Sequence, residues 1–327
     1  MGTILTDKLT GAMAWRGADI VADRNWMHSL TDMEIGALDD ALCAVRARGL
    51  AFPHFTKDDF PLPRLGGLLD DLTSELEDGR GFTLLRGLPV DRYSEEEVKT
   101  IYYGMGLHLG VPVSQNLTGD LIGQVMNVGD LKDPQTRVYE TNAYLPYHCD
   151  PSDVVGLLCL RKARSGGVSS LVSVAALYNR MVEVCPHYLG LFYRPMYYAH
   201  LGEELPTLTP LFSYHAGKLS CRYLRQYIEL AHDVMGTSLS KVENEAFDFF
   251  DAIAADPELR LDMLLEPGDI QFANNYMILH SRTAFDDHEE QSRRRKMLRL
   301  WLKMPNARTL APDFPGRNGI PARMPVA

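Results

Sequence analysis

The stretch that decides the fold is Asn142-Ala143-Tyr144-Leu145-Pro146-Tyr147-His148-Cys149-Asp150. Its aromatic and β-compatible residues, from Tyr144 onward, predict a strand. Residues two apart on a strand project from the same face, so His148 and Asp150 should lie side by side, with Cys149 turned into the packing. An imidazole beside a carboxylate is half of a divalent-metal site. Two histidines with one carboxylate form the open-faced ligand set typical of iron(II), which leaves positions free for substrates.

A second histidine must therefore come from a distant strand that folds back on the first. The candidate is His280, because its context resembles a strand: a turn at residues 267–269 precedes a short strand at residues 270–272, and an Asn pair leads into apolar residues 277–279. A histidine two residues from an aspartate is a weak signal alone. A surface or internally hydrogen-bonded histidine beside a turn Asp remains the alternative.

Residues 293–302, Arg-Arg-Arg-Lys-Met-Leu-Arg-Leu-Trp-Leu, alternate in character and predict a further strand. On it, Arg295 and Arg299 share one face, opposite a run of three leucines. A pair of inward guanidiniums is costly unless it meets anions. A dicarboxylate bound to a metal would supply them.

The order of these motifs resembles the TauD/TfdA (taurine dioxygenase-like, clavaminate synthase-like) family of iron(II)/2-oxoglutarate-dependent oxygenases. The resemblance covers about residues 81–303: His-x-Asp, then Gly-Gly-x-Ser, then a Pro-Gly-Asp strand leading to an Asn-rich segment and a His, then Arg-x-x-x-Arg. It implies that His148, Asp150 and His280 bind Fe(2+).

The same resemblance assigns roles around the metal. It implies that Ser169, in the segment 166–169, hydrogen-bonds a carboxylate of 2-oxoglutarate, and that Arg295 forms a salt bridge to the distal carboxylate of this cosubstrate. Arg299 would lie near the substrate. We also expect substrate contacts from three nearby polar residues, Asn142, Tyr144 and Asn275.

Two features depart from the family pattern. Val168 stands where relatives often have Asp or Asn, and an acidic segment, residues 286–290, separates His280 from the arginines. The spacing therefore leaves Arg294 open as the cosubstrate's partner in place of Arg295.

The resemblance implies an oxygenase that uses O2 and 2-oxoglutarate to oxidise, most simply to hydroxylate, a C–H bond of a small anionic or amino-acid-like metabolite, with release of succinate and CO2. The first alternative is a metalloenzyme of the same fold that does not use 2-oxoglutarate. The second is a non-catalytic small-molecule sensor. A small-molecule substrate is the expected partner, and a homo-oligomer is possible.

Composition argues against several other classes of protein. The net charge of −10 over 327 residues disfavours nucleic-acid binding. No segment approaches the ~20 apolar residues of a membrane span. Five scattered cysteines without a CxxC pair indicate reduced thiols and a cytoplasmic protein.

The pattern of elements predicts an α+β protein with a double-stranded β-helix (jelly-roll) core, because this fold brings an early and a late strand to one mouth. We expect one domain: a helical buttress at 1–80, the core at 81–303 with a helical insertion at about 185–260, and an extended tail at 304–327. Thr31 and Glu34 form a capping box that starts a helix. A helix at 241–255 should bury Phe249 and Phe250.

Substrate selection is expected from residues 112–145 and 195–235. Within the second range, Arg222 to Tyr227 mixes guanidiniums and phenols, and it fits either a pocket wall or an ordinary strand-to-helix turn. The histidines of this region, His187, His200, His215 and His232, are interpreted as structural.

Overall fold

The computed structural model describes residues 4–129 and 140–322. Within them, strands form two main sheets that face each other. The seven-stranded sheet has the order β1 (Met27–Ser29), β2 (Phe82–Arg86), β14 (Ile270–Asn274), β6 (Val154–Arg161), β17 (Lys296–Lys303), β3 (Val111–Pro112), with β4 (Ile122–Met126) beside β17. The four-stranded sheet has the order β13 (Leu261–Met263), β8 (Ser169–Ser173), β15 (Ile278–Arg282), β5 (Leu145–His148). The jelly-roll prediction is confirmed.

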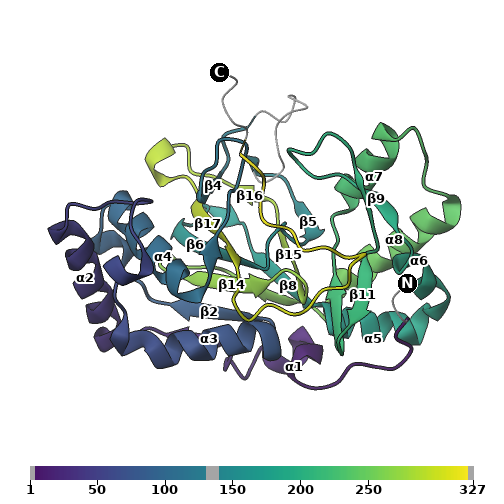
Figure 1. Cartoon of the computed structure of the whole chain (residues 1–327), viewed down its shortest axis with the longest axis horizontal. Helices are drawn as coiled ribbons and strands as arrows, with labels where there is room; N and C mark the ends of the chain where they lie inside the picture. The colour runs from purple at the N-terminus through teal and green to yellow at the C-terminus, as the bar shows by residue number, and fades with distance from the viewer. Residues whose placement is uncertain (1–3, 130–139, 323–327) are drawn as a thin grey trace.

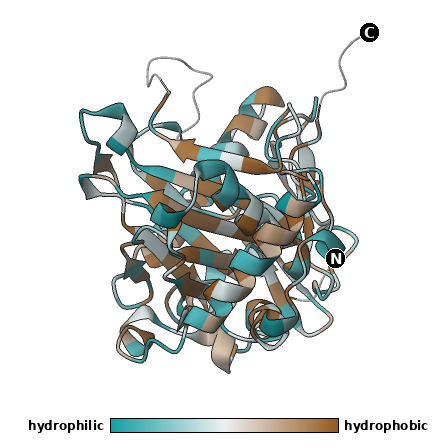
Figure 2. Cartoon of the chain, turned by 90° about the vertical axis from the view of Figure 1, so that its left-hand side faces the viewer, coloured by the Kyte–Doolittle hydropathy of each residue, from teal (hydrophilic) through white to brown (hydrophobic). Residues whose placement is uncertain are grey.

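An apolar layer fills the space between the two sheets. Phe82, Val155 and Met297 meet Leu171 and Ile278 there. Figure 2 shows the apolar colour concentrated on the strands and on the inner faces of the helices, whereas many outer loops are hydrophilic. This two-layer core fixes the sheets against each other, so that side chains on their facing surfaces are held at a constant separation.

Three helices cover the outer face of the seven-stranded sheet: α2 (Asp32–Ala47), α3 (Gly66–Asp78) and α4 (Glu95–Leu109). The Thr31–Glu34 capping box is formed, as predicted. The short helix α1 (Gly17–Ile20) precedes them. Strand β1 was not expected: it follows α1 and pairs in parallel with β2, so the first 80 residues add a strand to the sheet as well as helices.

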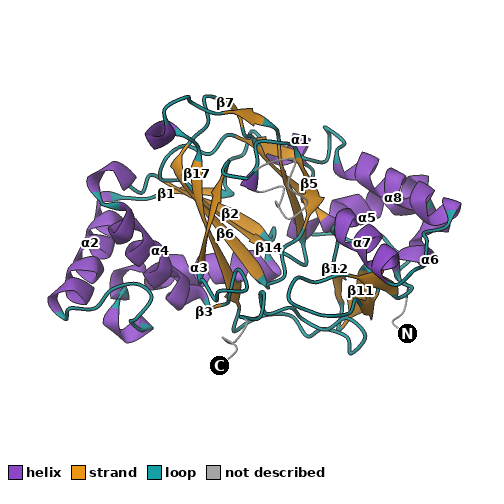
Figure 3. Ribbon diagram, turned by 90° about the horizontal axis from the view of Figure 1, so that it is seen from above, coloured by secondary structure: helices purple, strands orange, loops and turns teal. Residues whose placement is uncertain are grey.

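A second group of helices lies on the opposite side of the sheets (Figures 1 and 3). It comprises α5 (Val174–Val184), α6 (Leu189–Phe192), α7 (Arg225–Val234) and α8 (Lys241–Ala254). Two hairpins accompany them, β9 (Met196–Tyr198) with β10 (Thr207–Thr209), and β11 (Phe212–His215) with β12 (Lys218–Cys221). A third small pair joins β7 (Ser165–Gly166) to β16 (Phe285–Asp286).

Helix α8 corrects one expectation about burial. Phe250 is buried as expected, but Phe249 is 47% exposed and Phe247 is buried in its place. Phe247 and Phe250 are three apart and share a helix face, whereas Phe249 lies about 100° away from its neighbour and rests against Tyr188 at the surface. No described helix is both long enough and apolar enough to cross a membrane.

The turn before β14 predicts how much stability depends on a close backbone contact at Gly268. Gly268 has φ +88°, and a Cβ there would collide with the carbonyl oxygen of Leu88. Gly217 has a similar φ, +78°, but open space around it. We expect Gly217→Ala to lower the free energy of unfolding by about 1 kcal/mol, the cost of the left-handed conformation alone. Gly268→Ala should lower it by roughly 3 kcal/mol or more, because the turn must also move. Urea denaturation measures both, and equal losses would contradict the role given to the Leu88 contact.

Candidate metal centre

Two histidines meet because their strands are adjacent. Strands β5 and β15 are antiparallel neighbours, and His280 is the direct cross-strand partner of His148. Opposite residues in such a pair project from the same face. Their ring centroids are 4.2 Å apart. The fold therefore brings His148 and His280 together, as predicted.

Asp150 lies beside the two histidines, but it is carried by a loop and not by the strand that we expected. Strand β5 ends at His148, so Asp150 lies in the loop beyond it. Its backbone N–H donates to Oδ1 of Asn275 at 2.9 Å. The amide nitrogen of Asn275 donates in turn to the carbonyl and hydroxyl oxygens of Ser152, each at 3.0 Å. Asn275, which we expected to contact substrate, uses its amide to hold this loop and also lies on the wall of the larger cavity described below.

The three side chains fit a divalent cation. One ligand atom from each of His148, Asp150 and His280 can be chosen so that all lie within 4.8 Å of one another. His148 Nδ1 is 2.8 Å from the carbonyl oxygen of Pro146, which leaves Nε2 free to bind a metal. Asp150 Oδ2 is 3.5 Å from His280 Nε2. This oxygen is buried and has no hydrogen-bond partner among the described residues.

The electrostatics of the centre favour the protonation states that bind metals. Burial, and then the neighbouring His280, lower the pKa of His148 to about 3, so this imidazole is neutral. Burial alone would raise the pKa of Asp150, but Arg299 and the histidines outweigh it and lower this pKa. Arg299 Nη1 lies 3.7 Å from Asp150 Oδ1. A neutral imidazole such as that of His148, beside a carboxylate, can coordinate a cation without first losing a proton.

A small inner cavity of about 50 Å³ lies behind the metal ligands. Ser169, Arg282, Arg295 and Arg299 are on its wall together with His148, Asp150 and His280. The Ser169 hydroxyl donates to Gln271 at 2.8 Å. Nη1 of Arg295 and both Nε and Nη1 of Arg282 are buried without a hydrogen-bond partner in the described chain. Neither guanidinium forms an ion pair there, so the cavity offers uncompensated donors to an anion.

Geometry separates Arg294 from Arg295. Arg294 is turned away from the inner cavity, and its Nε is 3.4 Å from the carbonyl oxygen of His288. Arg295 lines the cavity, and its own backbone N–H is held by Asp287 at 2.7 Å. Burial lowers the pKa of Arg295, the effect expected of a buried cation that has no bound counter-ion.

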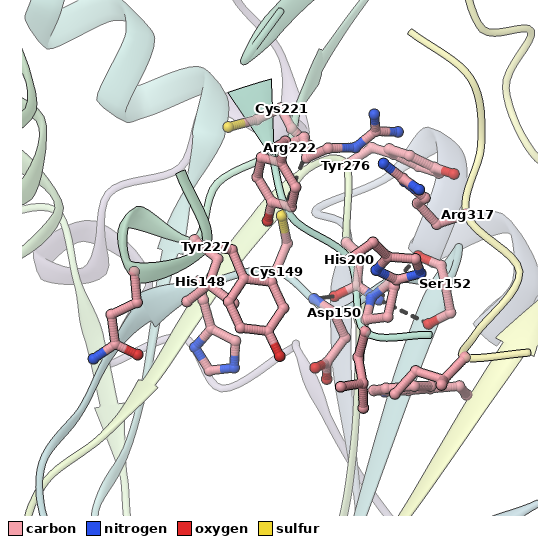
Figure 4. A pocket seen from close by; sticks show the side chains of 18 of the residues that line it. His148, Cys149, Asp150, Ser152, His200, Cys221, Arg222, Tyr227, Tyr276 and Arg317 are labelled. Carbon is pink, nitrogen blue, oxygen red and sulfur yellow. Dashed lines mark hydrogen bonds between the residues drawn. The ribbon is translucent and has the colours of Figure 1, made fainter. Parts of the chain in front are cut away.

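A larger cavity of about 460 Å³, here called the main cavity, opens on the other side of the ligands (Figure 4). His148 and Asp150 are on its wall, and most of the remaining wall comes from residues 195–235 and the segment 315–320. Arg222 and Tyr227 line it, which agrees with the pocket-wall interpretation of that stretch. Asn142 and Tyr144 do not: Asn142 donates to the carbonyl oxygen of Phe285 at 3.2 Å, and Tyr144 is 49% exposed.

Three residues on the cavity walls escaped the sequence analysis. Arg282 follows His280 by two positions on the same strand, so the alternation rule could have placed it on the metal-facing side. His200 was interpreted as structural, and Arg317 lies in the segment expected to be a plain tail. Both line the main cavity. No local pattern marks them, because their positions depend on how distant segments fold over the sheet.

Comparison with known proteins gives a consistent picture. The family model "Taurine catabolism dioxygenase TauD, TfdA family" matches residues 47–301. FR-33289 synthase of Streptomyces rubellomurinus is 34% identical over 318 residues, 94% of each chain. Taurine hydroxylase-like protein SAT17 of Stachybotrys chartarum is 28% identical over 308 residues, 90% of this chain and 80% of that one. An asparagine oxygenase solved with Fe(II), hydroxyasparagine and succinate superposes with a TM-score of 0.67 at 17% identity, covering 85% of this chain and 94% of its own.

The centre predicts a selective loss of metal binding. We expect His280→Ala to weaken Fe(II) binding by at least about 100-fold, because two ligands remain where three are needed. His200→Ala is the matched control, since His200 is equally buried on the main-cavity wall but outside the cluster. It should leave the affinity within about twofold. Anaerobic titration calorimetry measures both, and unchanged affinity in His280→Ala would rule out this ligand set.

Proposed function

The chain belongs to the taurine catabolism dioxygenase TauD, TfdA family, and we propose that its His148, Asp150 and His280 hold the iron(II) of a 2-oxoglutarate-dependent dioxygenase that hydroxylates a small metabolite. The observation that carries the proposal is the joint placement of the three ligands and two buried, uncompensated guanidiniums on one cavity wall. A dication on the ligands and a dicarboxylate beside them would satisfy both sets of groups.

Iron(II) supplies the site that binds the 2-oxo acid and O2 and couples their reaction to oxidation of the substrate. The overall balance is 2-oxoglutarate, O2 and a C–H bond converted into succinate, CO2 and a C–OH group. One oxygen atom enters succinate and the other enters the product. The contribution of the chain is to hold the reactants in line and to keep water away from them.

The distal carboxylate of 2-oxoglutarate is the natural counter-ion for the inner cavity. Arg295 is 7% exposed and can donate through Nη1, and Ser169 on β8 lies on the same wall. We add Arg282 to this subsite, because its unpartnered Nε and Nη1 line the same space. Its remaining nitrogen, Nη2, is held by the carbonyl oxygens of Thr141 and Ala143, so the group is fixed before a ligand arrives.

Arg299 separates the two cavities and lines both. Its Nε donates to Gln115 at 2.8 Å, and its guanidinium lies 4.2 Å from the centre of the Trp301 ring. With Nη1 3.7 Å from Asp150, we propose that it keeps this carboxylate ionised and oriented for the metal. A direct contact with an anionic substrate is compatible with the same position.

The main cavity suits a small metabolite, since its volume of about 460 Å³ is within the usual range for such ligands. The described cysteines are all unpaired, and this supports a reducing, cytoplasmic setting. The direct test of function is a screen of small acids for substrate-triggered succinate release, with gain of one oxygen atom in the product followed by mass spectrometry. Oxidation that proceeds with iron and O2 but without 2-oxoglutarate would favour the alternative metalloenzyme. Tight 2-oxoglutarate binding without any turnover would favour the sensor.

The cosubstrate subsite gives a paired prediction. We expect Arg295→Gln to raise the KM for 2-oxoglutarate by at least about tenfold, because a charge-assisted pair to a carboxylate is lost. Arg294→Gln is the control: this neighbour has the same chemistry but faces away from the cavity, and its KM should stay within about twofold. Succinate formation at varied 2-oxoglutarate measures both. The reverse order of effects would transfer the role to Arg294.

A further inference from the structure

Two arginines on the main-cavity wall have no part in the chemistry described so far. Arg222 follows strand β12, and Arg317 lies in the irregular segment near residue 320. Figure 4 shows their guanidiniums close together, on the side of the cavity away from His148. They come from segments 95 positions apart in the sequence, so no local pattern requires them to meet.

Arg222 is a buried cation whose direct hydrogen-bond and stacking partners are neutral groups. It is 5% exposed. Its Nη1 donates to the Thr209 hydroxyl at 2.9 Å, its Nη2 donates to the carbonyl oxygen of Pro315, and its guanidinium lies 4.4 Å from the centre of the Phe314 ring. It forms no ion pair with any described residue. Burial, and then the neighbouring Arg317, lower the pKa of Arg222, so both effects oppose its charge.

Arg317 is only partly compensated. Its Nη1 pairs with Glu203 at 2.6 Å and its Nη2 donates to the Thr207 hydroxyl at 2.6 Å. Its Nε is buried and has no hydrogen-bond partner in the described residues. His200 adds no negative charge: burial lowers its pKa, and its Nε2 is 3.1 Å from the carbonyl oxygen of Gly319. Among the described residues, Glu203 therefore pairs with Arg317, and the adjacent Arg222 has no carboxylate partner.

We propose that Arg222 and Arg317 form an oxyanion subsite that binds the anionic group of the primary substrate. This inference rests on the proposed function. It assigns recognition of the substrate's anionic group to Arg222 and Arg317, and not to the arginines nearest the metal ligands. The substrate class that follows is a small molecule with a carboxylate or a tetrahedral oxyanion at one end. Its other end, held between Leu145, Tyr198 and Tyr227, presents a C–H bond to the metal centre.

A purely structural role for Arg222 makes a different prediction. Its bond to Pro315 and its stacking on Phe314 could serve only to fasten the segment 313–320 over the cavity. If this were its only role, substitution of Arg222 would lower the stability of the protein, and Arg222 would bind no anion. Arg317 distinguishes the two roles, because it lines the main cavity with an Nε that has no hydrogen-bond partner among the described residues, and its other nitrogens are bound to partly exposed partners.

The probe is inorganic phosphate, titrated by calorimetry into the metal-free full-length chain, with acetate as a second arm. We expect saturable binding of phosphate, weakened by at least about tenfold in both Arg317→Gln and Arg222→Gln. Arg295→Gln is the control, because it removes the cation of the inner cavity and should leave phosphate binding intact. Melting curves confirm that each variant is folded. If Arg222→Gln does not fold, Arg317→Gln decides alone.

Each outcome has one meaning. Phosphate affinity that is unchanged in Arg317→Gln, or the absence of saturable binding to the wild type, overturns the subsite. Loss in the arginine pair with retention in Arg295→Gln supports it. Preference for phosphate over acetate assigns a tetrahedral dianion, and the reverse preference assigns a carboxylate. The titration uses neither iron nor 2-oxoglutarate, so a failure of the oxygenase proposal, seen as absent succinate, is distinguishable from a failure of the subsite.

Discussion

The cross-strand pairing of His148 with His280 is the constraint on which the rest of the structure depends. Side chains alternate along a strand, so a slip of one residue between β5 and β15 would turn one imidazole to the opposite face. The same strand β15 pairs on its other edge with β8, where Arg282 is opposite Ser169. One register therefore sets both the distance between the two histidines and the position of the arginine-lined inner cavity beside them. The apolar layer between the sheets holds that register.

Charge is distributed unevenly in this protein. The chain as a whole carries −10, yet the cavity walls carry Arg222, Arg282, Arg295, Arg299 and Arg317 against few carboxylates. Burying a cation without a partner is costly, so a fold retains such groups where a ligand compensates them. The negative exterior is provided by exposed helices and loops, whose acidic residues form ion pairs at the surface, such as Arg46 with Glu97. The charge distribution thus sets a negative exterior against cavity walls rich in arginine.

Local patterns were enough to predict the longer helices, most of the core strands and the three side chains, His148, Asp150 and His280, that the fold brings together. The Thr31–Glu34 capping box and the alternation of residues 295–302 are short-range signals that tertiary packing did not override. Asp150 was placed on a strand that in fact ends at His148, because the side-chain contact that ends it comes from Asn275, 125 positions away. Arg317 and His200 were missed for the same reason. Their role depends on the folding of residues 195–235 and 311–320 over the sheet, which no local period encodes.

The segment 311–320 has neither helix nor strand, yet it closes one side of the main cavity. Hydrogen bonds to several distant segments fasten it, among them Gly319 N–H to the carbonyl oxygen of Pro151 at 2.7 Å and Ile320 N–H to that of Ser114 at 2.9 Å. Irregular backbone can accept insertions and exchanges that a sheet register cannot. Our proposal therefore assigns reaction chemistry and substrate selection to separable parts of the chain. On this proposal, exchanges in residues 311–320 would change which compound is accepted and leave the strands that carry His148 and His280 in place.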